Sequence, residues 1–199
     1  MGESRFERAI ERIDEVNRAD PRSAMFGGVS WPVESLHSER MTVWLDRLEP
    51  DAGEAQRLAA RAHHLRRWER PRSNFPDGRA GYLRWRAAAR AGHADEVAAI
   101  LRDVGYDRDL IVAVEAIVRK EGPGASTHED ALCLVFLELQ AADFLATREL
   151  ADAQRIASRT VAKMSPAACR IGSELPLPAW VHDALVAAAT GGSVPDQGD

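Results

Sequence analysis

Apolar residues recur every three or four positions along most of the chain, which is the spacing of an amphipathic α-helix. The clearest case is residues 4–18, where charged residues separate Phe6, Ile10, Ile13 and Val16. The same spacing predicts further helices at residues 34–48, 51–69, 79–104, 107–121, 127–147, 148–165 and 178–189. No segment alternates convincingly between apolar and polar residues, as a half-buried strand does. The sequence therefore predicts an all-α fold.

Glycine and proline mark the connections between these helices, most clearly in the predicted loops 21–33 and 70–78. At 199 residues the chain is long enough to bury a sizeable core within one domain. We expect a single-domain bundle of about seven to nine helices. This domain would cover residues 1–190, and a disordered tail would follow at 191–199.

Composition narrows the classes of partner. The net charge of -5 gives no electrostatic reason to expect nucleic acid or an anionic membrane as a partner. The longest apolar run, 131–137, is too short to span a membrane, and the N-terminus lacks the apolar core of a signal peptide. Two isolated cysteines, Cys133 and Cys169, predict neither a disulfide framework nor a zinc motif. We expect a cytoplasmic protein.

Arginines are unevenly distributed along this acidic chain. Residues 61–90 contain nine of them against only Glu69 and Asp77. A local cationic field of this kind suits a small anionic ligand such as a phosphate or carboxylate, although a solvated helix face explains it equally well. If the ligand is a phosphate-containing substrate, the candidate binding residues are Arg40, Arg66, Arg67 and Arg84.

Two adjacent histidines, His63 and His64, lie in the predicted helix at 51–69. Successive side chains on a helix point about 100° apart, so the two imidazoles bracket the side opposite the apolar face. Arg67 follows four residues after His63 and three after His64, close enough to share a site with both. This arrangement predicts one wall of a polar pocket. A buried structural histidine beside a solvated one is the simpler interpretation of this segment alone.

Two further side chains extend the pattern. His37 lies on the apolar side of the predicted helix 34–48, and Asp143 lies within the most apolar predicted helix. Burying a carboxylate costs several kcal/mol unless a cation pairs with it. Three imidazoles and one carboxylate, from His37, His63, His64 and Asp143, form a suitable ligand set for one divalent transition metal. The candidates are Zn, Fe, Mn, Co and Ni.

The residues His37-Ser-Glu-Arg-Met, the pair at 63 and 64, and Ala-Ala-Asp143-Phe resemble the HD-domain superfamily of metal-dependent phosphohydrolases. The resemblance implies an HD-like helical bundle in which a His, a His-Asp pair and a distal Asp bind one metal. This chain has His63-His64 where the superfamily has His-Asp. An imidazole in place of the carboxylate shifts the preference from Mg²⁺ and Mn²⁺ toward Zn²⁺, Fe, Co²⁺ or Ni²⁺. The whole chain also resembles the family named domain of unknown function 4202.

Three functions remain open at this point. The first is metal-dependent hydrolysis of a small phosphate ester or nucleotide, with a metal-activated water as nucleophile and Glu34, Glu138 or Glu121 as the base. The second is a non-catalytic ligand-binding or interaction module, in which the histidines and Asp143 form a buried polar network. The third is an iron-dependent oxygenase, because the resemblance implies a scaffold that can also hold iron. Resemblance in fold alone does not decide between them.

Overall fold

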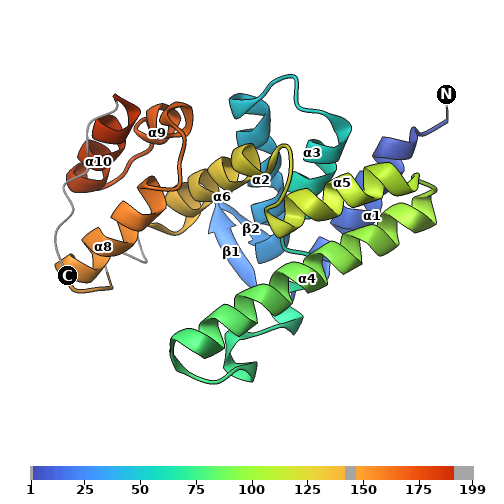
Figure 1. The fold of residues 1–199 in the computed structure, drawn as a ribbon, viewed down its shortest axis with the longest axis horizontal. Coiled ribbons are helices and arrows are strands. Elements are labelled where there is room, and N and C mark those ends of the chain that lie inside the picture. Colours follow the sequence, from blue (N-terminus) through green and yellow to red (C-terminus); the bar gives the residue numbers. More distant parts are fainter. Residues whose placement is uncertain (1, 142–146, 191–199) are drawn as a thin grey trace. The chain divides into compact units, whose positions relative to one another are not determined.

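The computed structural model describes residues 2–141 and 147–190. Helices dominate these residues, so the predicted all-α fold class is confirmed (Figure 1). The chain forms two compact units, Met1–His128 and Glu129–Asp199. The predicted ligand Asp143 and the predicted tail lie outside the described residues.

Four helices of the first unit follow the predicted segments closely: α1 (Arg5–Arg18), α2 (Val33–Leu48), α4 (Gly78–Val104) and α5 (Arg108–Arg119). Polar side chains fix the starts of α1 and α5. Ser4 and Glu7 form a capping box at α1, and the carboxylate of Asp107 accepts the backbone N–H of Leu110 at α5. Gly105 ends α4 with a φ of 92°, in the left-handed region that glycine enters without strain.

The single helix predicted over residues 51–69 is wrong in its second half. The helix α3 spans only Glu54–Arg61, and a turn follows it. Arg66 adopts a left-handed conformation with a φ of 51°, which takes the chain off the helical path. Ala62 and Leu65 within the turn are both fully buried. The apolar spacing therefore continues through the turn, although the helix does not.

The connection between α3 and α4 contains two short 3-10 helices, η1 (Arg67–Glu69) and η2 (Arg72–Asn74). The remainder of residues 70–77 is irregular, in agreement with the predicted loop. This loop packs closely on the start of α4. A Cβ added at Gly81 would lie 1.8 Å from the backbone oxygen of Pro76, so only glycine fits there.

The predicted loop at 21–33 contains a small antiparallel hairpin, β1 (Ser23–Phe26) and β2 (Val29–Pro32). Its turn is Gly27-Gly28, and both residues have positive φ, at 60° and 79°. A two-residue turn with positive φ at both positions is the one that matches the twist of a hairpin. The expectation that no strand is present is therefore wrong here, and the glycine pair was the available signal.

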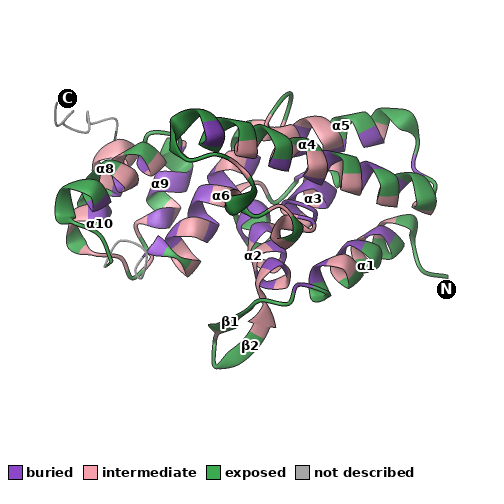
Figure 2. Cartoon of the chain, turned by 90° about the horizontal axis from the view of Figure 1, so that it is seen from below, coloured by how far each residue is buried: buried purple, intermediate pink, exposed green. Residues whose placement is uncertain are grey.

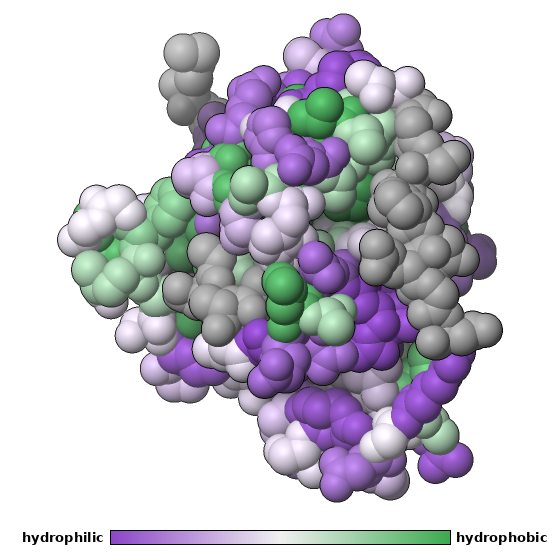
Figure 3. Space-filling model, turned by 90° about the vertical axis from the view of Figure 1, so that its left-hand side faces the viewer, coloured by the Kyte–Doolittle hydropathy of each residue, from purple (hydrophilic) through white to green (hydrophobic). Residues whose placement is uncertain are grey.

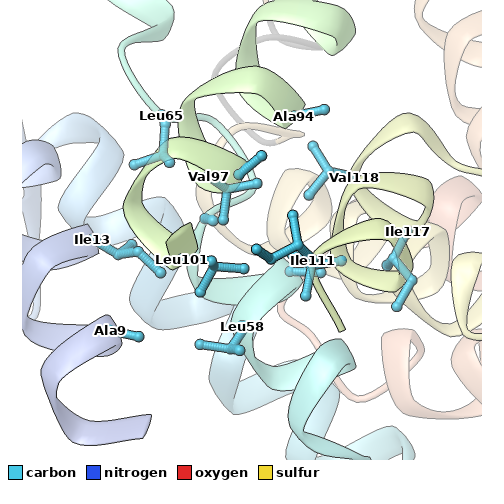
Figure 4. Packing of buried hydrophobic residues seen from close by; sticks show 14 of the residues in the cluster. Ala9, Ile13, Leu58, Leu65, Ala94, Val97, Leu101, Ile111, Ile117 and Val118 are labelled. Atoms are coloured by element: carbon cyan, nitrogen blue, oxygen red, sulfur yellow. The ribbon is translucent and has the colours of Figure 1, made fainter. Parts of the chain in front are cut away.

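Helices α1, α3, α4 and α5 pack around one apolar core in the first unit (Figure 4). Each contributes side chains from one face, as the predicted amphipathic spacing requires, and their outer faces are exposed (Figure 2). Fully burying a Leu, Ile or Val side chain stabilises the fold by about 1.5–3 kcal/mol. The large, fully buried members are Ile13, Leu58, Leu65, Val97, Leu101 and Val114.

The second unit consists of most of α6 (Ala125–Leu139), together with α8 (Leu150–Val161), α9 (Pro166–Gly172) and α10 (Ala179–Ala189). Helix α9 lies in the segment that the sequence predicts as a link. Ser165 caps it by accepting the N–H of Ala168. The buried carboxylate of Asp130 accepts the N–H of Ser165 at 2.8 Å and so ties α6 to α9.

No helix in the described part of the chain is both long enough and apolar enough to cross a membrane. Among the residues coloured in Figure 3, hydrophobic side chains form separate spots set among hydrophilic ones. Scattered exposed apolar residues of this kind are normal for a protein surface.

Candidate metal centre

Five of the six histidines of the chain gather in the first unit. His64 lies at the centre of this group, with its ring centroid 3.8 Å from that of His63 and 5.5 Å from that of His93. His37 lies 6.1 Å from His64, and His128 lies 4.8 Å from His63, again between ring centroids. Side chains from four separate segments therefore converge on one place.

The turn after α3 directs the two adjacent histidines inward. Ala62 and Leu65, on either side of the pair, are both anchored in the apolar core. The N–H of Leu65 donates to the carbonyl of Ala62, which keeps the turn tight. His63 is 5% exposed, and the side chain of His64 is 16% exposed. Because this segment is a turn, the helical separation of about 100° between adjacent side chains does not apply.

The first turn of α2 supplies a carboxylate and a further imidazole. Glu34 and His37 are three residues apart and therefore lie on the same face of the helix. Glu34 is only 1% exposed. Its backbone N–H donates to Oδ2 of Asp20 at 3.1 Å, so Asp20 caps α2 from a distant position in the sequence.

Arg22 holds one oxygen of Glu34. Its Nη2 donates to Oε1 of Glu34 at 2.6 Å, and its Nε and Nη2 donate to the carboxylate of Asp20 at 2.9 and 2.7 Å. The other oxygen, Oε2, is buried and has no hydrogen-bond partner among the residues that the structure describes. It lies 3.4 Å from Nδ1 of His64 and 3.6 Å from Nδ1 of His37. Sequence reasoning missed both Asp20 and Arg22.

The cluster of Glu34, His37 and His64 could hold a metal ion. One potential ligand atom from each residue lies within 4.8 Å of the other two. Nδ1 of His64, like Oε2 of Glu34, is buried without a hydrogen-bond partner in the described part of the chain. Unpaired buried polar atoms are costly, and a cation placed between them would remove that cost.

The protonation states of Glu34 and His64 suit metal binding. Burial alone would raise the pKa of Glu34, but the neighbouring His37 and Arg22 lower it below its ordinary value. Burial, with smaller contributions from Arg67 and His93, lowers the pKa of His64 well below its ordinary value. At neutral pH Glu34 is therefore a carboxylate and His64 a neutral imidazole, which are the forms that bind a metal.

His63 lies beside this cluster, and one of its ring nitrogens is paired with another histidine. Its Nδ1 lies 2.8 Å from Nε2 of His128, at the start of α6. Gly124 places α6 there, because a Cβ at this position would lie 2.9 Å from the side chain of Gln56. Nε2 of His63 is buried without a hydrogen-bond partner. The predicted role of His63 as a ligand stays a prediction, since pairing with His128 also explains its burial.

His93, which the sequence did not select, also faces this region from α4. Its Nδ1 lies 2.7 Å from the backbone carbonyl of Leu65, which can only accept, so Nδ1 carries the proton. Nε2 consequently holds a lone pair, and within residues 2–141 and 147–190 it is buried without a hydrogen-bond partner. Burial lowers the pKa of His93 to about 4.

Arg67 is the predicted substrate-binding arginine that lies against the cluster. Its Nη1 is 3.4 Å from Nε2 of His64, and its guanidinium lies 4.9 Å from the ring centroid of Trp85. Burial lowers the pKa of Arg67. A positive charge held in a partly buried position beside a candidate metal centre suits an anionic ligand.

The other predicted arginines have different surroundings. Arg66 pairs with Glu69 and Glu96, at 3.0 and 3.3 Å. Arg40 lies over the rings of Phe26 and Trp44, at 5.4 and 5.6 Å. Arg84 is exposed on α4. The structure thus brings Arg67 to His64. Glu138, the other predicted catalytic carboxylate, belongs to the second unit.

The fold and this cluster define a mainly α-helical protein with a candidate metal centre. The chain belongs to the family described as domain of unknown function, DUF4202, whose family model matches residues 7–185. No curated protein and no solved structure matches the chain.

Proposed function

We propose that this protein is a metal-dependent hydrolase of a small phosphate ester or nucleotide. Glu34, His37 and His64 would hold one divalent transition metal. The observation that carries the proposal is the position of Oε2 of Glu34, buried and unpaired, between two imidazole nitrogens at 3.4 and 3.6 Å.

These separations fit a shared ion. Zinc binds imidazole nitrogen and carboxylate oxygen at about 2.0–2.2 Å, so two ligands of a tetrahedral site lie about 3.3–3.6 Å apart. A neutral imidazole in ordinary contact with a carboxylate would instead donate a hydrogen bond at about 2.7–3.2 Å. Burial lowers the pKa of His64, which disfavours the charged form that an ion pair with Glu34 would need. Three protein ligands with a position left for water is the usual arrangement of a catalytic zinc.

The chain's own groups supply the remaining requirements. When bound, the metal would lower the pKa of a water and polarise the phosphoryl group. Arg22 keeps Glu34 ionised and oriented, because it holds Oε1 while Oε2 faces the imidazoles. Arg67 would hold the phosphate next to His64. His93 would orient a water through the lone pair on its buried Nε2.

The order of the candidate ligands supports the same class. His37 followed by the pair at 63 and 64 resembles the metal-binding pattern of the HD-domain superfamily, with His64 in the place of the aspartate. Imidazole in that place favours Zn²⁺, Fe, Co²⁺ or Ni²⁺ over Mg²⁺. Asp143 lies outside the described residues and Glu138 belongs to the second unit, so their roles as ligand and base stay predictions from the sequence. The cytoplasmic location and the lack of nucleic-acid or membrane partners likewise remain predictions from the sequence.

A non-catalytic module is the second candidate, because Arg22 already neutralises Glu34 without a metal. Metal content separates the two. Purified protein would be stripped with a chelator, reloaded with Zn²⁺, Mn²⁺, Fe²⁺, Co²⁺ or Ni²⁺, and analysed for metal per chain. The variants are Glu34→Gln and His64→Ala, and the control is His182→Ala, whose exposed side chain lies in the second unit.

We expect about one metal per chain in the wild type and the control, and none in the other two variants. Loaded wild type should hydrolyse 4-nitrophenyl phosphate, and stripped protein should not. Circular dichroism would confirm that each variant is folded. Wild-type protein that binds none of the five metals would overturn the proposal in favour of the non-catalytic module.

A further inference from the structure

Among the described residues Arg67 differs from its neighbours Arg66 and Arg70 in having no acidic partner. Within residues 2–141 and 147–190, no carboxylate lies within ion-pair distance of its guanidinium. Arg66 and Arg70, on the same connection, both pair with Glu96. Glu34, whose charge acts on Arg67, is held by Arg22. A partly buried guanidinium that contacts an imidazole and an aromatic ring, but no carboxylate among the described residues, is suited to bind an anion.

Two aromatic side chains belong to the first turns of α4: Trp85 lies next to Arg67, and Tyr82 lies next to Trp85. The guanidinium of Arg67 lies 4.9 Å from the ring centroid of Trp85, and Trp85 lies 5.8 Å from the ring centroid of Tyr82. The ring of Tyr82 is largely accessible, because the residue is 44% exposed. Arg86 lies 5.7 Å from the ring of Tyr82 and adds a second positive charge at this end.

The side chain of Trp85 and the backbone before Tyr82 are held in place. Nε1 of Trp85 donates to the backbone carbonyl of Arg70 at 2.9 Å. Gly81, the residue before Tyr82, is in contact with the backbone of Pro76, so the loop before α4 lies directly against the helix. Groups that are already ordered lose little conformational entropy when a ligand binds, which makes a fixed surface more effective than a flexible one.

We infer that Arg67, Trp85 and Tyr82 form a subsite for a phosphate ester that carries a planar aromatic ring. Arg67 binds the phosphate on the side of His64, and the ring stacks on the exposed face of Tyr82 beside Trp85. The identification of the anion as a phosphate rests on the proposed function. The aromatic selectivity rests on the geometry of α4 alone.

Two physical effects support this assignment. A guanidinium forms short, charge-assisted hydrogen bonds with phosphate oxygens, and these strengthen where water is partly excluded. Aromatic rings prefer offset or tilted contacts with centroids about 4.5–7 Å apart, the range in which Tyr82 and Trp85 already lie. An exposed tyrosine beside a fixed tryptophan can therefore accept a further ring without rearrangement.

Calorimetric titration of the full chain tests the phosphate contact. The probes are phenyl phosphate and methyl phosphate, titrated into zinc-loaded and into chelator-treated protein. Arg67→Gln should weaken the binding of both probes by about ten-fold or more in either preparation, because a charge-assisted contact is lost. Arg79→Gln, which removes an exposed arginine from the start of α4, is the matched control and should change binding less than about two-fold.

A second pair of variants tests the aromatic contact. Wild type should bind phenyl phosphate several-fold more tightly than methyl phosphate. Tyr82→Ala should remove most of that difference and leave methyl phosphate binding unchanged. Leu83→Ala, which removes an equally exposed apolar side chain at the next position, should preserve the difference. Both changes place alanine in a helix, where it is well tolerated.

The results separate this inference from the proposed function. Phosphate binding that depends on Arg67 in protein that binds no metal, or that hydrolyses no phosphate ester, would support the subsite and overturn the hydrolase. Metal-dependent hydrolysis that is unaffected by Arg67→Gln, with unchanged probe binding, would overturn the subsite and leave the hydrolase standing. Equal binding of the two probes by wild type would overturn the aromatic selectivity.

Discussion

Nδ1 of His63 and Nε2 of His128 lie 2.8 Å apart, so a hydrogen bond joins the turn after α3 to the start of α6. Both residues are buried, at 5% and 2% exposure. This bond links the segment that carries His64 to another helix. It therefore helps to hold the candidate metal centre in place.

Loss of this bond should destabilise the protein. His128→Ala leaves Nδ1 of His63 buried without its partner and opens a cavity, so we expect the free energy of unfolding to fall by about 1–3 kcal/mol. Urea denaturation of metal-free protein measures this change. His182→Ala, at an exposed position, should stay within about 0.5 kcal/mol of the wild type. Equal stability of the two variants would contradict a structural role for His128.

Removal of Arg22 should be more costly. Arg22→Met leaves the buried carboxylates of Asp20 and Glu34 without their shared cation, and breaking a buried ion pair in this way costs about 3–5 kcal/mol. Half of the Arg22 side chain is exposed, so we expect the lower part of that range. Arg18→Met, which breaks an exposed pair with Glu11, should cost less than about 1 kcal/mol. Chemical denaturation at neutral pH compares the two, and similar losses would show that Arg22 is dispensable.

Stability should fall as the pH falls below 6.5. Burial lowers the pKa of His93 from 6.5 to about 4, so the unfolded chain binds its proton first. The stabilisation from keeping His93 neutral is complete above pH 6.5 and is lost as the pH falls toward about 4. It amounts to about 3 kcal/mol at most. The pKa values of His63 and His64 are also lowered by burial and act in the same direction.

Urea denaturation of metal-free protein between pH 7.5 and 4.5 measures this dependence. His93→Phe removes one of the titrating groups, so its stability should depend less steeply on pH than that of the wild type. Stability that is level across this interval would contradict the assignment of neutral, buried imidazoles.

Gly81 should tolerate no side chain. In Gly81→Ala the new Cβ would meet the backbone oxygen of Pro76, which no side-chain rotation can relieve, so we expect a loss of about 1–3 kcal/mol. Gly53→Ala is the matched control, because its Cβ would meet only Oε1 of Gln56 at 3.8 Å. Thermal unfolding of both variants would show the difference. Similar melting temperatures would mean that the loop before α4 can move away freely.

Most of the helical architecture can be predicted from the sequence, because amphipathic spacing and capping residues are local signals. Helices α1, α2, α4 and α5 begin and end close to their predicted bounds. The end of α3 could not be predicted in the same way. Ala62 and Leu65 continue the apolar spacing, and the left-handed conformation of Arg66 has no signal in a residue that is not glycine.

The candidate site was predictable only in part. His37 and His64 were selected as ligands from their residue type and position, and the structure places both beside Glu34. Glu34 itself was expected to be a base. Its position among the ligands depends on Arg22 and Asp20, which lie 12 and 14 residues earlier. The hairpin between them and α2 brings their side chains to Glu34. Helical spacing in the sequence does not reveal this return of the chain.

The hydrogen bond from Arg22 to Oε1 of Glu34 affects how readily a bound ion would dissociate. Because one oxygen is already committed, Glu34 can contribute a single coordinate bond. A centre built from one such bond and two imidazoles releases its ion more readily than a closed four-ligand structural site. Metal would then exchange with the surrounding pool, and purification in the presence of a chelator would remove it. The availability of each metal, as well as the affinity of the site, would decide which ion the protein carries.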